Sequence, residues 1–197
     1  MGLLDQIKNK AAQEIGNAVG DAVRSAANAG GKQTESFTFK DIPGNLAELQ
    51  ALPECSMDTP FKTAALTVCA LCAYAVNKDA GIEMLNFLKG PQPLSQMELQ
   101  FLQDRFMDGK TYVPLSYFKG ATPDNNYTPS EPLTLEVFSN PYSYDNDGYA
   151  RLLIRSGGAD TERPITLRKR GSDGKWFLWE QMLLADIRQP KASDPWA

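Results

Sequence analysis

Basic and aromatic side chains gather around a Gly-Ser-Asp-Gly turn near the end of this 197-residue chain. Arg168 and Arg170 precede the turn, and Trp176 and Trp179 follow it. Arginine beside aromatic rings can bind single-stranded nucleic acid or a phosphate-bearing ligand, so these four are candidate binding residues. The alternative is a solvated strand face, because the arginines alternate with apolar residues. The formal net charge of −4 makes nucleic acid an unfavoured partner.

The chain contains no histidine, which is the side chain best suited to proton transfer near neutral pH and the commonest metal ligand. Ser-His-Asp and Cys-His hydrolysis and histidine-based zinc sites are therefore excluded. Acidic residues are plentiful, but sequence alone sets no separation between their carboxylates. We predict no catalytic residues, no metal site and no cofactor, and favour a non-enzymatic protein over an enzyme.

Three cysteines, Cys55, Cys69 and Cys72, are an odd number that does not indicate a disulfide framework. Cys69 and Cys72 have the spacing of a redox or zinc motif, but they lie within a continuous apolar run that lacks a second such pair. We predict buried thiols and no disulfides. The start has no signal-peptide pattern, so we expect a cytoplasmic protein, with a location peripheral to the membrane as an alternative.

Two loop motifs resemble binding sequences without completing them. Asp145-Asn-Asp-Gly148 resembles part of a calcium loop, but Ile154 stands where a bidentate glutamate belongs. Gly157-Gly158 follows a predicted strand, yet neither a Lys-Ser or Lys-Thr pair nor a helix follows it, as a phosphate loop requires. We interpret the first as a turn and the second as the start of a loop.

Residues 1–33 form a separate unit, predicted as an amphipathic small-residue helix and a glycine linker. Apolar residues, among them Leu4, Ile7 and Ile15, recur at helical spacing. The glycines of this segment lower its helix propensity, so the helix is expected to form only against another surface. We favour association with a second copy or a protein partner. Binding to a membrane surface through residues 1–28 and passive covering of the domain are the alternatives.

Residues 34–197 are predicted to form one α+β domain, with a helical layer (about 45–107) packed on an antiparallel sheet (about 133–188). Three helix starts carry capping signals, at Asn45, at Thr59-Pro60 and at Ser95 with Glu98. The helix from Pro60 to about Asn77 is apolar nearly all round, Val76 included, which predicts a central buried position. In the helix from Ser95 to Met107, two stripes are predicted as core: Met97, Phe101 and Arg105, and Leu99, Leu102 and Phe106.

Alternating patterns predict strands at Phe37–Phe39, Leu133–Val137, Tyr149–Arg155, Pro164–Arg170, Lys175–Trp179 and Gln181–Arg188. Short turns between most of the later strands favour a meander in which consecutive strands pair. The stretch from Lys110 to Pro132 has no clean periodicity and is rich in proline and tyrosine. We predict a loop held in place by its aromatic side chains. A small-ligand or catalytic site between this loop and the sheet is the alternative to an interaction module.

From Pro43 to Ala197 the chain resembles an uncharacterised bacterial family that is classed as a domain of unknown function. The resemblance rests on TPFKTAALTVCALC from Thr59, IEMLNFLKGPQPLS from Ile82, RFMDGKTYVPLSYFKGATP from Arg105 and KWFLWEQMLLADIR from Lys175. It covers about residues 43–197, nearly the whole predicted domain. The resemblance implies no activity, so no functional residues carry over to this chain.

Overall fold

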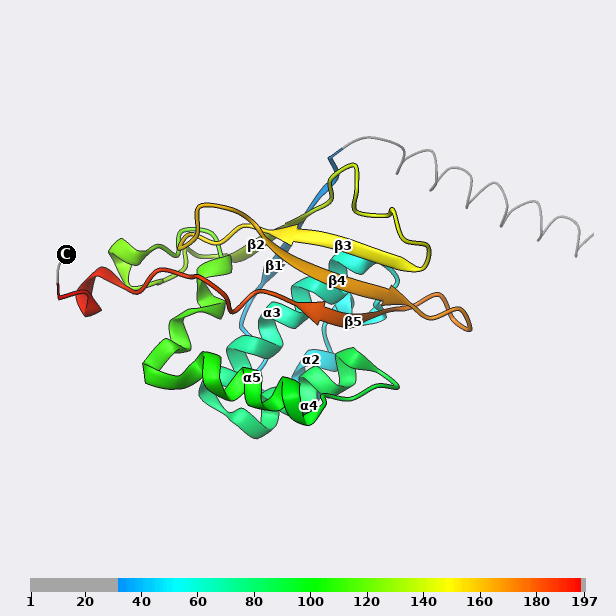
Figure 1. Cartoon of the computed structure of the whole chain (residues 1–197), viewed down its shortest axis with the longest axis horizontal. Helices are drawn as coiled ribbons and strands as arrows, with labels where there is room; N and C mark the ends of the chain where they lie inside the picture. The colour runs from blue at the N-terminus through cyan, green and yellow to red at the C-terminus, as the bar shows by residue number, and fades with distance from the viewer. Residues whose placement is uncertain (1–31, 196–197) are drawn as a thin grey trace, which may run out of the picture.

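The computed structural model describes residues 32–195, which form a layer of helices against a five-stranded antiparallel sheet (Figure 1). This arrangement confirms the predicted α+β class. In Figure 1 the helix α3 lies behind the strands, and α4 and α5 lie below them. The predicted N-terminal helix, with Leu4, Ile7 and Ile15, lies outside the described residues.

The sheet is the predicted meander, because each strand pairs with the next one along the chain. Its strands are β1 (Thr34–Phe39), β2 (Leu133–Phe138), β3 (Tyr149–Ile154), β4 (Arg163–Lys169) and β5 (Trp176–Gln181). Alternating side chains such as Ile165 and Leu167 face the core, whereas Thr166 and Arg168 face outward. One side of the sheet therefore packs on the helices and the other faces solvent.

One row of residues that lie opposite one another on successive strands crosses the whole sheet and starts at Thr34, the first residue of β1. Thr34 lies opposite Phe138, Phe138 opposite Leu153, and Leu153 opposite Pro164. The amide of Met182, just after β5, donates to the carbonyl of Pro164 at 3.1 Å. The residue at which the chain enters the sheet, Thr34, and the residue just after β5, Met182, therefore lie at the two ends of this row, on opposite edges of the sheet.

The strand predicted over Gln181–Arg188 is wrong, because β5 ends at Gln181. Leu183 and Leu184 are both buried, which an alternating strand on one face cannot achieve. The side chain of Gln181 accepts a hydrogen bond from the amide of Leu183 at 2.8 Å. Asp186 has a φ of 53°, a left-handed conformation that ends any extended run. The apolar run is therefore a buried turn.

The four α-helices among the described residues are α2 (Leu46–Gln50), α3 (Pro60–Val76), α4 (Lys78–Lys89) and α5 (Gln96–Phe106). The three with predicted capping signals begin where those signals place them, and α4 begins after a cap at Asn77 that was not predicted. The side chains of Asn45 and Thr59 accept hydrogen bonds from the amides three residues later, at the starts of α2 and α3. Ser95 and Glu98 form a complete capping box at α5. Each cap satisfies an amide that has no partner within its own helix.

The prediction that α3 is the central buried helix is confirmed, but three residues expected in the core are exposed. Val76, at the last turn of α3, is 91% exposed; in α5, Met97 is 83% exposed and Arg105 is also exposed. Val76 lies where α3 runs past the elements that cover it. Helix α5 buries Leu102 and leaves Met97 at the surface, because only one of its two apolar stripes faces the core.

Tyrosine side chains hold the segment between α5 and β2 in place, as predicted. The hydroxyl of Tyr117 donates to the carbonyl of Leu183 at 2.5 Å, and that of Tyr127 donates to the carbonyl of Arg188 at 2.5 Å. The ring of Tyr112 stacks on that of Tyr127, with centroids 5.1 Å apart. The segment therefore binds the turn after β5 and covers one end of the domain.

Gly157 and Gly158, which follow β3, allow the segment between α5 and β2 to pack directly against the backbone at this point. The amide of Gly157 donates to the carbonyl of Ser116 at 2.8 Å, and a Cβ on Gly157 would lie 1.9 Å from the carbonyl oxygen of Ala121. A Cβ on Gly158 would lie 2.0 Å from the hydroxyl of Tyr127. These glycines are needed because the tyrosine-held segment passes directly against them.

We expect Gly157→Ala to lower the free energy of unfolding by about 2 kcal/mol, because the backbone at Ala121 must shift to admit the methyl group. Urea denaturation of the two proteins measures the difference. Gly171→Ala is the matched control, since a Cβ there would meet nothing within 4 Å. Equal stability of the two variants would contradict the packing role of Gly157.

Candidate functional site

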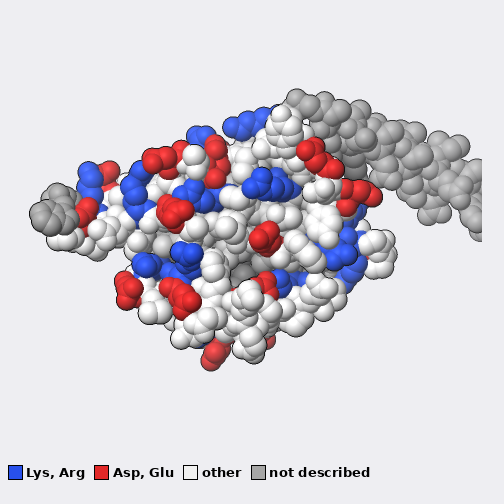
Figure 2. Space-filling view, viewed as in Figure 1, with Lys and Arg blue, Asp and Glu red and all other residues white. Residues whose placement is uncertain are grey.

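A groove with a volume of 260 Å³ opens between α5 and the outer edge of β5. In Figure 2 the surface is hollowed where β5 faces the helices. Its apolar lining comes from both sides: Leu94, Met97, Phe101, Trp179 and Met182. Met182 is 44% exposed, so each side presents an accessible methionine, a side chain that adapts to partners of varied shape. We call this feature the α5–β5 groove.

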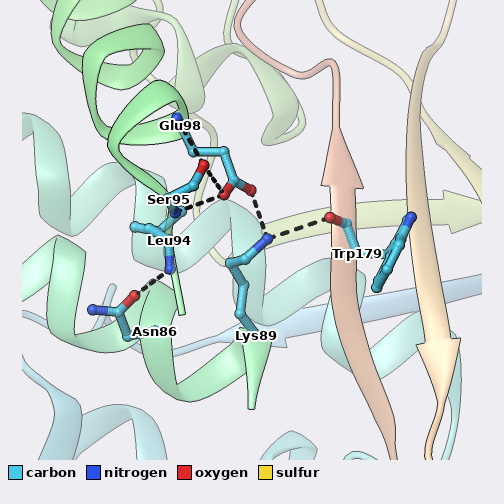
Figure 3. A network of polar contacts seen from close by, with 6 residues as sticks. All are labelled: Asn86, Lys89, Leu94, Ser95, Glu98 and Trp179. Atoms are coloured by element: carbon cyan, nitrogen blue, oxygen red, sulfur yellow. Dashed lines mark hydrogen bonds and ion pairs between the residues drawn. The ribbon is translucent and has the colours of Figure 1, made fainter. Parts of the chain in front are cut away.

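Lys89 joins three elements beneath the groove (Figure 3). Its Nζ atom, at the end of α4, lies 2.6 Å from Oε1 of Glu98 in α5 and donates to the carbonyl of Trp179 in β5 at 3.4 Å. The side chain of Lys89 is 8% exposed, so these partners replace most of the water that would otherwise solvate its ammonium group. The link sets the distance between α5 and the edge of the sheet.

Glu98 serves both this link and the start of its own helix. Its Oε2 atom accepts hydrogen bonds from the amide and the hydroxyl of Ser95, at 2.8 and 2.7 Å. Burial raises the pKa of Glu98, but the hydrogen bonds from Lys89 and Ser95 outweigh it, and the pKa lies below the ordinary value. The carboxylate is therefore ionised at neutral pH and pairs with Lys89.

Three of the four residues predicted as a binding cluster, Arg168, Arg170 and Trp179, line one hollow of 350 Å³. Two of them, Arg168 and Trp179, are in direct contact. The guanidinium of Arg168 lies 4.8 Å from the ring centroid of Trp179 and 5.5 Å from that of Tyr149. The two rings meet nearly at right angles, with their centroids 5.7 Å apart. Arg168 therefore forms cation–π contacts on the solvent face of the sheet.

Arg170 and Trp176 have other partners. Arg170 pairs with Asp173 in the turn and lies 4.4 Å from the ring centroid of Phe177. The backbone of Trp176 is held at the helical side, by Met57 and Thr63. Arg168, Arg170 and Trp179 thus share one hollow with Phe177, whereas Trp176 does not line it. Tyr149 and Phe177 are the aromatic partners that the sequence reasoning missed.

The pairing register of the strands indicates which aromatic residues, absent from the predicted cluster, lie near the arginines. Tyr149 and Phe177 both lie directly opposite Arg168, on the two neighbouring strands. Cross-strand neighbours on one face lie close enough for their side chains to interact. The hairpin between β4 and β5 predicts the approximate position of Phe177, whereas the position of Tyr149 depends on the pairing across a longer loop.

Opposite charges alternate over the surface in Figure 2. Several of these charges are paired on or beside the sheet, as in Arg155 with Glu162 at 2.9 Å and Lys119 with Glu136 at 2.8 Å. A surface that attracts nucleic acid instead gathers unpaired positive charge along one path. The charge pattern of this face gives no support to a nucleic-acid interface.

The space between the tyrosine-held segment and the sheet is a hollow of 200 Å³. Small-molecule sites in proteins commonly measure about 300–1,000 Å³. The polar groups that line the hollow already have partners: Ser116 and Ser156 share a hydrogen bond of 2.7 Å, and Glu136 pairs with Lys119. This hollow therefore offers little free hydrogen-bonding capacity to a ligand.

The three cysteines are free thiols, and Cys69 and Cys72 are buried in α3 as predicted. Burial raises the pKa of both thiols, so neither is an activated nucleophile. Within residues 32–195, no three cysteine or carboxylate side chains are placed to bind a metal ion together. Over the same residues, no helix has the length and apolar character needed to span a bilayer.

Removing the carboxylate of Glu98 is expected to destabilise the protein in a pH-dependent way. Because the folded state lowers the pKa of Glu98, its contribution is complete above the ordinary value of 4.5 and is lost as the pH falls through the lower folded value. We expect Glu98→Gln to cost about 2 kcal/mol at pH 7, since it leaves Lys89 nearly buried without a counter-charge. The deficit should shrink below pH 4.5 in urea denaturation series.

Glu162→Gln is the matched control for this substitution. Its partner Arg155 has a side chain that is 69% exposed, so we expect a change within about 0.5 kcal/mol at pH 7. A deficit of Glu98→Gln that equals the control at pH 7, or that stays constant on acidification, would contradict the role assigned to the link with Lys89.

One family of proteins shares this domain. A family described as a domain of unknown function, DUF6935, matches residues 41–191, from the residues before α2 to the segment after β5. No curated protein and no solved structure matches the chain significantly. The match begins after β1, although β1 completes the sheet. Because it spans more than half of the sequence, the chain belongs to this family of domains of unknown function.

Proposed function

We propose that this protein is a non-enzymatic interaction module in which residues 1–33 serve self-association or association with a protein partner. The observation that carries the proposal is the α5–β5 groove, an open apolar surface with exposed methionines on both sides. Groups of exposed apolar side chains on soluble domains typically mark sites of interaction. The amphipathic pattern of residues 1–33, with Leu4, Ile7 and Ile15, supplies a second apolar surface.

A small-ligand or enzymatic role has weaker support. The hollow beside the tyrosine-held segment is small, and its serine and carboxylate groups have partners within the domain. The Arg168 contacts with Tyr149 and Trp179 stabilise the solvent face of the sheet without a ligand. We infer a cytoplasmic location, because the chain keeps three free thiols, as is usual in a reducing compartment.

Three aspartates on the apolar face of the N-terminal segment are expected to abolish association. We expect the full chain to assemble in size-exclusion light scattering, and the variant Leu4→Asp, Ile7→Asp, Ile15→Asp to be a monomer. Burying a carboxylate in an apolar contact is costly, so each substitution opposes association. The matched control is Gln6→Asp, Asn9→Asp, Gln13→Asp, which adds the same charge on the opposite helical face and should leave assembly unchanged.

Two other outcomes would redirect the proposal. If the full chain is a monomer and the triple variant still binds every physiological protein partner, the segment has no role in association. If the full chain instead floats with phosphatidylcholine–phosphatidylserine vesicles, and the triple variant does not, residues 1–28 act at a membrane surface.

A further inference from the structure

We propose that the hollow between the end of α4 and the β4–β5 hairpin binds the phosphate group of a small phosphorylated molecule. Arg168, Lys169 and Arg170 line this hollow, which has a volume of 350 Å³ and which we call the hairpin hollow. Its volume lies within the range of about 300–1,000 Å³ in which proteins commonly bind small molecules. The site uses no residue of the segment 1–33, so it is independent of the proposed association.

The charge of the hairpin hollow is one-sided, because four cationic side chains line it and no aspartate or glutamate does. Lys89 pairs with Glu98, and Arg170 pairs with Asp173. The other two cations, Arg168 and Lys169, have no ion-pair partner within residues 32–195. Two neighbouring cations without a counter-charge favour a multiply charged anion, and a phosphomonoester carries about −1.5 to −2 charges at pH 7.

Arg168 is held in place by contacts that leave its hydrogen-bond donors available. Its guanidinium lies 4.8 Å from the ring centroid of Trp179 and 5.5 Å from that of Tyr149. Cation–π attraction acts on the charge and does not use the N–H groups. Within the described residues the Arg168 side chain makes no hydrogen bond. A positioned guanidinium whose N–H donors are all unused is suited to bidentate binding of phosphate oxygens.

The turn of the hairpin holds a second guanidinium on the same side of the strand. Asp173 accepts hydrogen bonds from Nε and Nη2 of Arg170, the first at 2.9 Å. These hydrogen bonds lower the pKa of Asp173 to about 2, so its carboxylate stays ionised and keeps Arg170 in place. The Nη1 group of Arg170 has no hydrogen-bond partner in the described part of the chain. Because residues two apart on a strand share a face, this group can donate to the same anion as Arg168.

Aromatic side chains in the lining favour a phosphate ester over inorganic phosphate. The ring of Phe177 is closely packed: the guanidinium of Arg170 lies 4.4 Å from its centroid, and a Cβ on Gly90 would lie 2.5 Å from its Cδ1 atom. Trp179 lines the same hollow and is 38% exposed. An inorganic phosphate ion would leave these apolar surfaces in contact with water, whereas the organic part of an ester can cover them.

The surroundings of the hollow favour a small molecule over a nucleic-acid strand. Cations elsewhere on or beside the sheet are paired, such as Arg155 with Glu162 and Lys119 with Glu136. A nucleic-acid strand requires a path of unpaired cations along its backbone. One phosphate group requires only the cations of the hairpin hollow.

Isothermal titration calorimetry of the full chain with adenosine 5′-diphosphate (ADP), inorganic pyrophosphate and adenosine tests the proposal. We expect ADP to bind saturably, pyrophosphate to bind at least tenfold more weakly, and adenosine not to bind measurably. Arg168→Gln and Lys169→Gln should each weaken the binding of ADP at least fivefold, because each removes an unpaired cation from the hollow. Both side chains are exposed, so the fold should tolerate both changes.

Arg105→Gln is the matched control for these variants. Arg105 is also an exposed arginine over an aromatic ring, 5.0 Å from the centroid of Phe101, but it does not line the hairpin hollow. Its replacement removes the same charge and the same kind of contact, and we expect it to bind ADP like the parent protein.

The proposal is wrong if neither ADP nor pyrophosphate binds at millimolar concentration, or if Arg105→Gln weakens binding as much as Arg168→Gln. Pyrophosphate that binds as tightly as ADP would overturn the assignment to an ester and leave inorganic phosphate as the occupant. A short oligothymidylate strand that binds at least tenfold more tightly than ADP, and depends equally on Arg168, would assign the hollow to a nucleic-acid surface instead. None of these results bears on the association of residues 1–33, which light scattering tests separately.

Discussion

The burial of α3 is the constraint on which the rest of this domain depends. A helix that is apolar on all sides must be covered on all sides, and here the sheet covers one face and α4 another. Helix α4 approaches so closely that a Cβ on Gly81 would lie 2.3 Å from Cα of Tyr74. The threonine hydroxyls of α3 have partners within the protein: Thr67 donates to the carbonyl of Thr63, and Thr63 donates to the carbonyl of Trp176 in β5, both at 2.8 Å.

The hydrogen bond from Thr63 to Trp176 fixes the start of β5 against α3, and the location of the groove depends on this position of β5. An edge strand presents unpaired backbone groups that proteins usually cover. At the start of β5, Trp176 donates to the carbonyl of Met57 at 2.9 Å and accepts from Thr63. Further along, Lys89 reaches the carbonyl of Trp179 with its side chain alone. The cover provided by α3 and its preceding turn ends there, and the α5–β5 groove begins.

The sequence predicted what depends on neighbours along the chain and missed what depends on distant ones. The caps at Asn45, Thr59 and Ser95 act within three residues, and each helix begins as expected. The run after Gln181 has the apolar content of a strand, but its two leucines fill the core next to the tyrosine-held segment, whose Tyr117 lies 66 residues before Leu183 in the chain. Met97 lies on an apolar stripe, yet no local pattern reveals that this stripe points past the core.

The candidate site escaped sequence analysis for the same reason, because its two walls lie far apart along the chain. Met97 and Met182 are unremarkable where they stand, and only the packing of α5 beside β5 makes them face each other. The contacts of Lys89 with Glu98 and Trp179 hold the two walls together, so the residues that fix the groove differ from those that form its surface. Partly buried, charge-assisted hydrogen bonds connect the two walls of the groove, whereas flexible thioether side chains form part of its surface.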